Sequence, residues 1–131
     1  ALGLPALLRA HKLQARAARG GFDWPEVSQV LDKIEEEIGE LRHEIAGGTG
    51  PDRLEDEIGD VLFAVVNLAR HLGIDSEAAL RRTNAKFERR FHAVEEGLAA
   101  AGKSPADASL EEMEGLWVAA KLRERDADGG E

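Results

Sequence analysis

Cysteine is absent from this sequence of 131 residues. The chain therefore forms no disulfide, no thiolate metal site and no cysteine nucleophile, and nothing in it indicates an oxidising compartment. It also lacks a stretch of about 18 apolar residues that could span a bilayer, and its first residues do not resemble a secretory signal. We therefore expect a soluble, cytoplasmic protein. The missing initiator methionine is explained either by trimming before a small residue or by a segment taken from a longer chain.

Basic residues are the scarcer charged class, with 17 Lys and Arg against 26 Asp and Glu, so that the formal net charge is −9. This excess of negative charge repels nucleic acids and anionic membranes, which we therefore exclude as general partners. An acidic protein can still bind a polyphosphate if it gathers its cations locally or recruits a divalent metal ion. The length suits one hydrophobic core, and we predict a single domain over residues 1–131.

Strand signals are scarce, whereas apolar residues recur at spacings of three and four, as expected for helices. Gly20-Gly21 ends the first helical segment, and Asp75-Ser76 begins the fourth. Ser109-Leu110-Glu111-Glu112 is typical of a capping box and begins the fifth segment. The predicted helical segments span about residues 5–19, 27–45, 54–72, 76–98 and 109–120.

Short loops between long amphipathic helices make neighbouring helices antiparallel, so we predict an all-α antiparallel bundle of about five helices. The apolar stripes of the second and third segments should face its core. Residues 126–131 form a charged tail that ends in glycine and glutamate, and we expect this tail to be disordered.

Two pairs of carboxylates carry the strongest functional signal. Glu37 and Glu40 lie three residues apart on the second segment, so they share one helix face. Glu57 and Asp60 have the same spacing on the third segment. Helical geometry places both pairs on the same flank of their apolar stripes, and antiparallel packing can then bring the four carboxylates together. A solvated acidic face is the ordinary meaning of a glutamate run, but the second pair borders a stretch, residues 61–72, that is almost uncharged.

Converging carboxylates repel one another and raise each other's pKa, which opposes folding. A divalent cation removes this conflict, and all-oxygen ligands suit Mg²⁺ or Mn²⁺. A di-iron bundle would need Glu-x-x-His pairs instead. Because Mg²⁺ held by carboxylates also accepts phosphate oxygens as ligands, the pattern favours a substrate that contains phosphate.

The order of these residues resembles the all-α nucleoside triphosphate pyrophosphohydrolase superfamily. Its acidic signature is similar to Glu36-Glu37-x-x-Glu40, sixteen intervening residues and then Glu57-x-x-Asp60. Further blocks resemble the MazG family, especially the C-terminal domain of its two-domain members, and the resemblance extends from about Leu4 to Lys121. These blocks are residues 21–24 (Gly-Phe-Asp-Trp), 57–63, 66–73 and 84–91.

The resemblance implies a MazG-type enzyme that hydrolyses nucleoside triphosphates to a nucleoside monophosphate and pyrophosphate, as housekeeping of the nucleotide pool. Its cofactor would be Mg²⁺, with Mn²⁺ as an alternative. Either Glu36 or Glu40 would be the catalytic base that orients the attacking water. The implied metal ligands are Glu37, Glu40, Glu57 and Asp60, and the implied nucleotide contacts are Lys86, Arg90, Trp117 and Lys121.

The residue pattern supports these nucleotide contacts, with an ordinary alternative for each. Lys86 and Arg90 are four residues apart and can present two cations to one polyphosphate, although a solvated basic face has the same spacing. Trp117 and Lys121 repeat this spacing, and a tryptophan in an apolar stripe is more often a core residue than a base contact. Asn84 interrupts the stripe of its helix and is either a structural hydrogen-bonding group or a further substrate contact.

Two other functions stay open as alternatives. One is a narrower all-α hydrolase that acts on dUTP, dCTP or phosphoribosyl-ATP. The other is a non-catalytic helical binding module whose acidic face is only solvated. We also predict a homodimer, because the MazG resemblance implies tight association and because Val66 widens the apolar arc of the third segment beyond what one neighbour covers.

Overall fold

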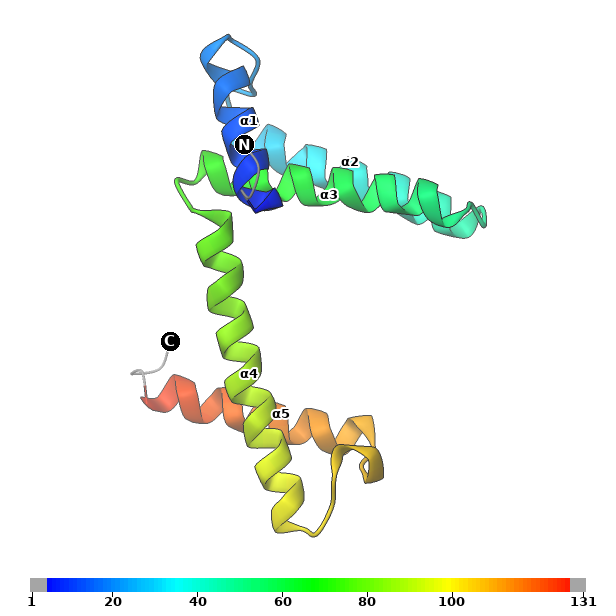
Figure 1. Cartoon of the computed structure of the whole chain (residues 1–131), viewed down its shortest axis with the longest axis vertical. Coiled ribbons are helices and arrows are strands. Elements are labelled where there is room, and N and C mark those ends of the chain that lie inside the picture. The colour runs from blue at the N-terminus through cyan, green and yellow to red at the C-terminus, as the bar shows by residue number, and fades with distance from the viewer. Residues whose placement is uncertain (1–4, 128–131) are drawn as a thin grey trace. The chain divides into compact units, whose positions relative to one another are not determined.

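The computed structural model describes residues 5–127 and is all-α within that range (Figure 1). The predicted all-α fold is therefore confirmed. No helix among the described residues is long and apolar enough to cross a membrane. In chain order the elements are α1 (Ala6–Arg19), α2 (Val27–Ala46), α3 (Pro51–His71), α4 (Ser76–Ala100), the short 3₁₀-helix η1 (Pro105–Asp107) and α5 (Leu110–Ala127).

The chain divides after Leu80 into two compact units. The N-terminal unit contains α1, α2, α3 and the start of α4, whereas the C-terminal unit contains the remainder of α4 with η1 and α5. The single domain expected over residues 1–131 stays a prediction.

Local sequence explains most of the helix ends. Gly21 follows the end of α1 with a φ of 95°, a left-handed conformation that glycine adopts without steric cost. Asp75 caps α4, because its Oδ1 accepts hydrogen bonds from the backbone N–H groups of Glu77 and Ala78 at 2.9 and 3.2 Å. Both ends were predicted from the sequence and are confirmed.

The start of α5 forms only half of the predicted capping box. The Ser109 hydroxyl accepts from the Glu112 backbone N–H at 3.0 Å, but the Glu112 carboxylate accepts from Lys103 at 3.1 Å instead of reaching back to the cap. At its other end α5 continues to Ala127 and so includes residues 126 and 127 of the predicted tail. Residues 128–131 of the predicted tail lie outside the described residues.

The N-terminal unit is built on an antiparallel hairpin of α2 and α3, which lie side by side, with α1 packed against α3 (Figure 1). Its buried apolar residues are Val30 from α2 with Ala64 and Val66 from α3. Helix α3 begins at Pro51, earlier than predicted, because proline suits the first position of a helix.

The apolar stripes of this hairpin are covered only in part, which corrects the prediction that they face a core. Leu31, Ile38 and Ile45 of α2 are exposed, and so are Leu62 and Val65 of α3. The physical reason is that the apolar arcs of α2 and α3 are wider than the area that the neighbouring helices of the N-terminal unit cover. Val66 itself is only 2% exposed, so the residue taken to widen the arc is buried inside the chain.

The C-terminal unit buries Val94 and Leu98 of α4 together with Ala120 of α5. A close approach between the two helices occurs at Gly97, where an added Cβ would lie 2.8 Å from Cδ2 of Leu116. Glycine at this position therefore lets the Leu116 side chain lie directly against the α4 backbone.

Candidate functional site

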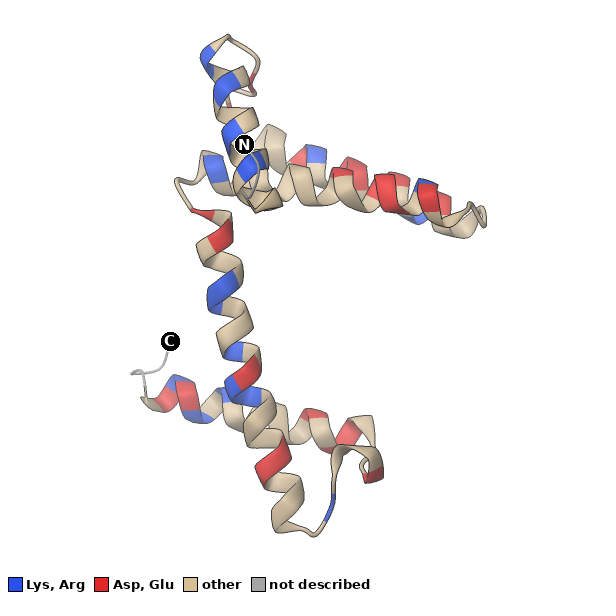
Figure 2. Ribbon diagram, viewed as in Figure 1, with Lys and Arg blue, Asp and Glu red and all other residues tan. Residues whose placement is uncertain are grey.

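Three of the predicted metal ligands meet between α2 and α3. Carboxylate oxygens of Glu37 and Glu40, from α2, and of Glu57, from α3, all lie within 4.8 Å of one another. The spacing of three residues places the first two on one face of α2, and the antiparallel hairpin places the third opposite them. Figure 2 shows acidic residues gathered along this hairpin. We call Glu37, Glu40 and Glu57 the acidic cluster.

Two members of the acidic cluster are buried, and each has one carboxylate oxygen without a hydrogen-bond partner. Glu37 is 6% exposed and Glu57 is 9% exposed. The Oε2 atoms of both residues are buried and have no hydrogen-bond partner in the structure. Burial raises the pKa of the Glu57 carboxyl, and the negative charges of Glu40, Asp60 and Glu37 raise it further.

This donor set fits a hard divalent cation. Buried carboxylate oxygens without hydrogen bonds are costly unless a positive charge faces them, and a Mg²⁺ or Mn²⁺ ion would supply it with the oxygen ligands that these ions prefer. The acidic cluster of the structure can therefore hold a metal ion.

Asp60 and Glu36 lie at the margins of the acidic cluster. Asp60 is exposed, and it lines the adjoining pocket instead of joining the group of converging oxygens. Glu36 is also exposed, and its Oε1 lies 3.4 Å from Nζ of Lys33. Lys33 lies closer to Glu37, with Nζ 3.0 Å from Oε1, and this hydrogen bond is the main reason why the pKa of Lys33 is raised.

An open polar hollow also borders the acidic cluster. It contains Glu40 and Glu57 of the cluster and also Arg53, whose Nη2 lies 3.2 Å from Oε1 of Glu44. Arg53 is therefore the cation of this hollow. Its lining residues are Glu36, Gly39, Glu40, His43, Glu44, Arg53 and Glu57.

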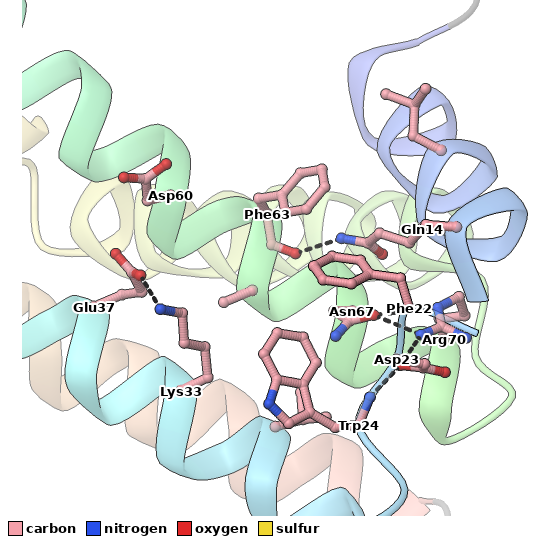
Figure 3. A pocket seen from close by; sticks show the side chains of 14 residues that line it. Gln14, Phe22, Asp23, Trp24, Lys33, Glu37, Asp60, Phe63, Asn67 and Arg70 are labelled. Carbon is pink, nitrogen blue, oxygen red and sulfur yellow. Dashed lines mark hydrogen bonds and ion pairs between the residues drawn. The ribbon is translucent and has the colours of Figure 1, made fainter. Parts of the chain in front are cut away.

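A second feature of the N-terminal unit is a cavity of about 290 Å³ next to the acidic cluster. In Figure 3, Glu37, Lys33 and Asp60 lie at one end of this pocket, whereas the aromatic and amide side chains lie at the other. Its volume is near the lower end of the range for small-molecule sites, about 300–1,000 Å³. The lining residues are Leu13, Gln14, Ala17, Phe22, Asp23, Trp24, Val30, Lys33, Glu37, Asp60, Phe63, Ala64, Asn67 and Arg70. We call it the aromatic pocket.

The loop that carries the pocket aromatics is tied to the end of α3. Asp23 Oδ1 accepts hydrogen bonds from Nη2 of Arg70 at 2.7 Å and from the backbone N–H of Trp24 at 2.8 Å, and it lies 2.9 Å from Nε2 of His71. The hydrogen bond from Arg70 is the main reason why the pKa of Asp23 is lowered. Phe22 and Trp24 are held beside α3 by this network.

The five predicted nucleotide contacts all lie in the C-terminal unit. Lys86 is half-buried, whereas Asn84 and Lys121 are exposed. Trp117 is also half-buried, and its ring centre lies 5.3 Å from that of Phe87. The structure therefore gives Trp117 a packing partner on α4, and its role as a base contact stays a prediction.

Arg90 has a structural partner that the sequence analysis did not find. Its Nε lies 2.9 Å from Oε1 of Glu124, and this hydrogen bond lowers the pKa of the Glu124 carboxyl. The Arg90 guanidinium also lies 5.8 Å from the centre of the Trp117 ring. In the structure Arg90 thus joins α4 to α5, and its contact with a phosphate stays a prediction.

Comparison with known proteins assigns the family. Residues 25–94, more than half of the chain, match the model of the MazG nucleotide pyrophosphohydrolase domain. The chain belongs to the MazG family. The matched range contains all of α2 and α3, and therefore every member of the acidic cluster.

Curated MazG relatives agree with this assignment. The chain is 49% identical over 124 residues to the nucleoside triphosphate pyrophosphohydrolase of Escherichia coli K12, which is 94% of this chain and 47% of that protein. It is 40% identical over 118 residues to the nucleoside triphosphate pyrophosphohydrolase/pyrophosphatase MazG of Thermotoga maritima, or 90% of this chain and 45% of that one. The chain spans about half the length of these two relatives.

The aromatic pocket is the part of this MazG domain that the sequence analysis did not find. Phe22 and Trp24 enter the sequence analysis only through the family block at residues 21–24. No periodicity indicates that this loop returns to α3, because Asp23 and Arg70 are separated by 46 residues of chain. The sequence does contain a signal for this pocket, namely the two aromatic residues Phe22 and Trp24 on either side of Asp23. The turn itself needs neither aromatic ring.

Proposed function

We propose that this chain hydrolyses nucleoside triphosphates to a nucleoside monophosphate and pyrophosphate, with Mg²⁺ as cofactor. One observation carries the proposal: the acidic cluster and the aromatic pocket adjoin, and Glu37 belongs to both. A nucleoside triphosphate has the matching parts, an anionic chain that binds a metal ion and a flat apolar base. The Escherichia coli and Thermotoga maritima relatives carry this activity in their names.

Mg²⁺ would be held by Glu37, Glu40 and Glu57, with Asp60 as the fourth predicted ligand. When bound, the ion would supply positive charge that polarises a phosphoryl oxygen and lowers the pKa of a nearby water. Mn²⁺ satisfies the same oxygen ligands and is the alternative cofactor.

The chain's own carboxylates would direct the water. Glu36 at the margin of the acidic cluster and Glu40 within it are both exposed, and either one would accept the proton of a water whose oxygen bonds to the α phosphorus. The bond from the α phosphorus to the bridging oxygen then breaks, and pyrophosphate leaves with that oxygen. Lys33, half-buried between the cluster and the pocket, is placed to offset negative charge on the phosphates.

The C-terminal unit would supply further nucleotide contacts. We propose that Lys86, Arg90 and Lys121 contact the nucleotide, as the family resemblance implies, and that Asn84, which interrupts the apolar stripe of its helix, is a further substrate contact. Trp117 was proposed to stack on the base, and Trp24 of the aromatic pocket is a second candidate for that role. Replacing each tryptophan by alanine and measuring KM distinguishes the two candidates.

The burial of Glu37 and Glu57 counts against one of the two alternative functions. A merely solvated acidic face would not bury Glu37 and Glu57 with unpartnered oxygens, so a non-catalytic binding module is disfavoured. A narrower hydrolase for dUTP, dCTP or phosphoribosyl-ATP is compatible with the same acidic cluster and differs only in the substrate that the pocket accepts.

We also propose that the protein acts as a homodimer in the cytoplasm. The exposed apolar side chains on α3, Ile58, Leu62 and Val65, leave a surface that a second copy of the hairpin would cover. Burying such side chains removes apolar surface from water, at roughly 25 cal/mol for each Å².

Product analysis tests the proposed reaction. The chain is incubated with ATP, GTP, CTP, UTP and their deoxy forms, with Mg²⁺ or with EDTA, and the phosphorus products are followed by ³¹P NMR. We expect monophosphate and pyrophosphate in equal amounts with Mg²⁺ and no turnover with EDTA. Release of orthophosphate would contradict the reaction, and turnover of one nucleotide alone would favour the narrower hydrolase. Glu40→Gln, prepared in the same way, controls for contaminating enzymes.

A further inference from the structure

Two amide side chains of the aromatic pocket have a fixed orientation. Gln14 of α1 donates from Nε2 to the backbone carbonyl oxygen of Phe63 at 2.9 Å. Because a carbonyl oxygen can only accept, the NH₂ group must face it, and the amide oxygen must face elsewhere. That Oε1 is buried and has no hydrogen-bond partner, in a side chain that is only 7% exposed.

Asn67 of α3 is oriented in the opposite sense. Its Oδ1 accepts hydrogen bonds from Nε and Nη2 of Arg70 at 3.2 and 2.8 Å. A guanidinium can only donate, so the oxygen of Asn67 must face Arg70 and the NH₂ group is left for another partner. Asn67 is 6% exposed, and no hydrogen bond from its Nδ2 occurs among the described residues.

We propose that Gln14 and Asn67 recognise the hydrogen-bonding edge of a nucleobase. Gln14 Oε1 accepts from an N–H of the base, and Asn67 Nδ2 donates to an acceptor on the same edge. Every common nucleobase carries both a donor and an acceptor, so this pair selects nucleotides with a base over simple polyphosphates. It does not select one base over the others. The inference rests on the proposed function for its ligand class, and it deepens that function by naming the recognition groups.

Arg70 and Asp23 act here as positioning residues. Arg70 fixes the Asn67 amide, and Asp23 fixes Arg70 through the 2.7 Å contact. The same Asp23 oxygen accepts from the backbone N–H of Trp24. One hydrogen-bond network therefore orients the Asn67 amide, which contacts the edge of the base, and also positions the loop with Trp24, whose ring lines the pocket beside the face of the base (Figure 3).

A base that donates to Gln14 Oε1 would bind favourably, because this buried oxygen has no hydrogen-bond partner in the structure. A buried acceptor without a partner loses its hydrogen bonds to water and regains none, and a bound base that donates to it removes this penalty. Sites built in this way reject analogues that lack the matching group more strongly than sites that only enclose a shape.

Binding of adenosine to the full chain in EDTA tests the inference without hydrolysis or metal. The side-chain NH₂ signals of Gln14 and Asn67 are followed by ¹⁵N NMR during the titration, with ribose 5-phosphate as the control ligand. We expect adenosine to shift the Asn67 NH₂ signals and ribose 5-phosphate to leave them unchanged. Asn67→Asp keeps the oxygen that faces Arg70 but loses the donor, and it should bind adenosine at least about tenfold more weakly. Gln14→Met, of similar size but without the acceptor, should weaken binding by a similar factor.

Edited ligands assign each contact. Purine riboside lacks the exocyclic amine of adenosine, and 1-deazaadenosine lacks the neighbouring ring acceptor. Purine riboside should bind the wild type more weakly than adenosine does, but the two ligands should bind Gln14→Met equally. In the same way, 1-deazaadenosine should bind the wild type more weakly than adenosine does, but the two should bind Asn67→Asp equally. Wild-type affinity for adenosine in both variants would overturn the inference. Adenosine binding of the expected pattern without pyrophosphate release from any triphosphate would contradict the proposed function and leave this inference standing.

Discussion

Lys33 Nζ lies 3.0 Å from Glu37 Oε1, and this ion pair joins the acidic cluster to the aromatic pocket. Lys33 compensates one oxygen of Glu37, while the other, Oε2, is buried and unpartnered. Lys33 therefore places one positive charge beside the acidic cluster, and this charge does not neutralise all three carboxylates.

Removal of an acidic ligand should abolish activity and not weaken the fold. We expect Glu40→Gln and Asp60→Asn each to eliminate hydrolysis at saturating Mg²⁺. In metal-free buffer their unfolding midpoints should equal or slightly exceed that of the wild type, because Glu40 and Asp60 both repel the Glu57 charge. Thermal unfolding with EDTA and with Mg²⁺ measures the stability. Glu114→Gln, an exposed acid on α5, is the control and should keep full activity. Full activity in either ligand variant would exclude that residue from the metal site.

The ion pair of Asp23 with Arg70 should make stability depend on pH. The pKa of Asp23 is lowered in the folded state, so its stabilisation is present above the ordinary aspartate pKa, about 3.9, and is lost as pH falls through the lowered value. We expect Asp23→Asn to lower the free energy of unfolding by about 1–2 kcal/mol at pH 7. The difference from the wild type should shrink below about pH 3.9. Urea unfolding of both proteins across this range measures it, and a difference that is constant with pH would contradict the ion pair.

Lys86 and Arg90 of α4 should contribute more to the turnover of nucleoside triphosphates than Arg82 does. We expect Lys86→Ala and Arg90→Ala to reduce kcat/KM for ATP at least about tenfold more than Arg82→Ala does, which corresponds to about 1.4 kcal/mol. Arg90 also holds Glu124, so its substitution has a structural effect as well. Glu124→Gln measures that structural effect, together with the loss of the longer pair between Arg89 Nε and Glu124 Oε2 at 3.5 Å. If Glu124→Gln impairs turnover as much as Arg90→Ala does, the phosphate role of Arg90 is wrong.

Substitution of Trp117 separates packing from base contact. The ring packs on Phe87 and Arg90, so Trp117→Ala should lower the free energy of unfolding by roughly 2 kcal/mol, less than the 3–5 kcal/mol typical of a fully buried aromatic. If the ring also stacks on the base, KM should rise by a factor equivalent to about 1–3 kcal/mol. Kinetics and thermal unfolding of the same variant measure both quantities, and Trp24→Ala is compared in parallel. An unchanged KM for Trp117→Ala removes this residue from the nucleotide site.

The exposed face of α3 should mediate self-association. We expect sedimentation equilibrium to give a dimer at micromolar concentration, because a second copy would remove the exposed apolar side chains on α3 from water. Val65→Lys should shift the equilibrium toward monomer, since it places a charge in the proposed contact. Arg82→Ala, on an exposed position of α4, should not alter the mass. A wild-type monomer at this concentration would count decisively against the homodimer.

The sequence by itself determined the helices and most of their ends, because these depend on neighbours within one turn. Gly21 and Asp75 act through their own backbone and side chain, and their roles were predicted correctly. The pairing of Glu37 with Glu40 was equally local, since three residues along a helix return to the same face. Val66 shows the limit of this reasoning, because periodicity placed it on an apolar arc without showing which part of the arc is covered.

Only the tertiary structure decided what lies opposite each face. It brought Glu57 to Glu37 and Glu40 while leaving Asp60 at the margin, although the spacing treated the four carboxylates alike. It also returned the loop of Asp23 to Arg70, which created the aromatic pocket and oriented the amide of Asn67. The physical reason is that a repeat along one helix specifies the direction of a side chain, whereas its partner depends on how two helices pack.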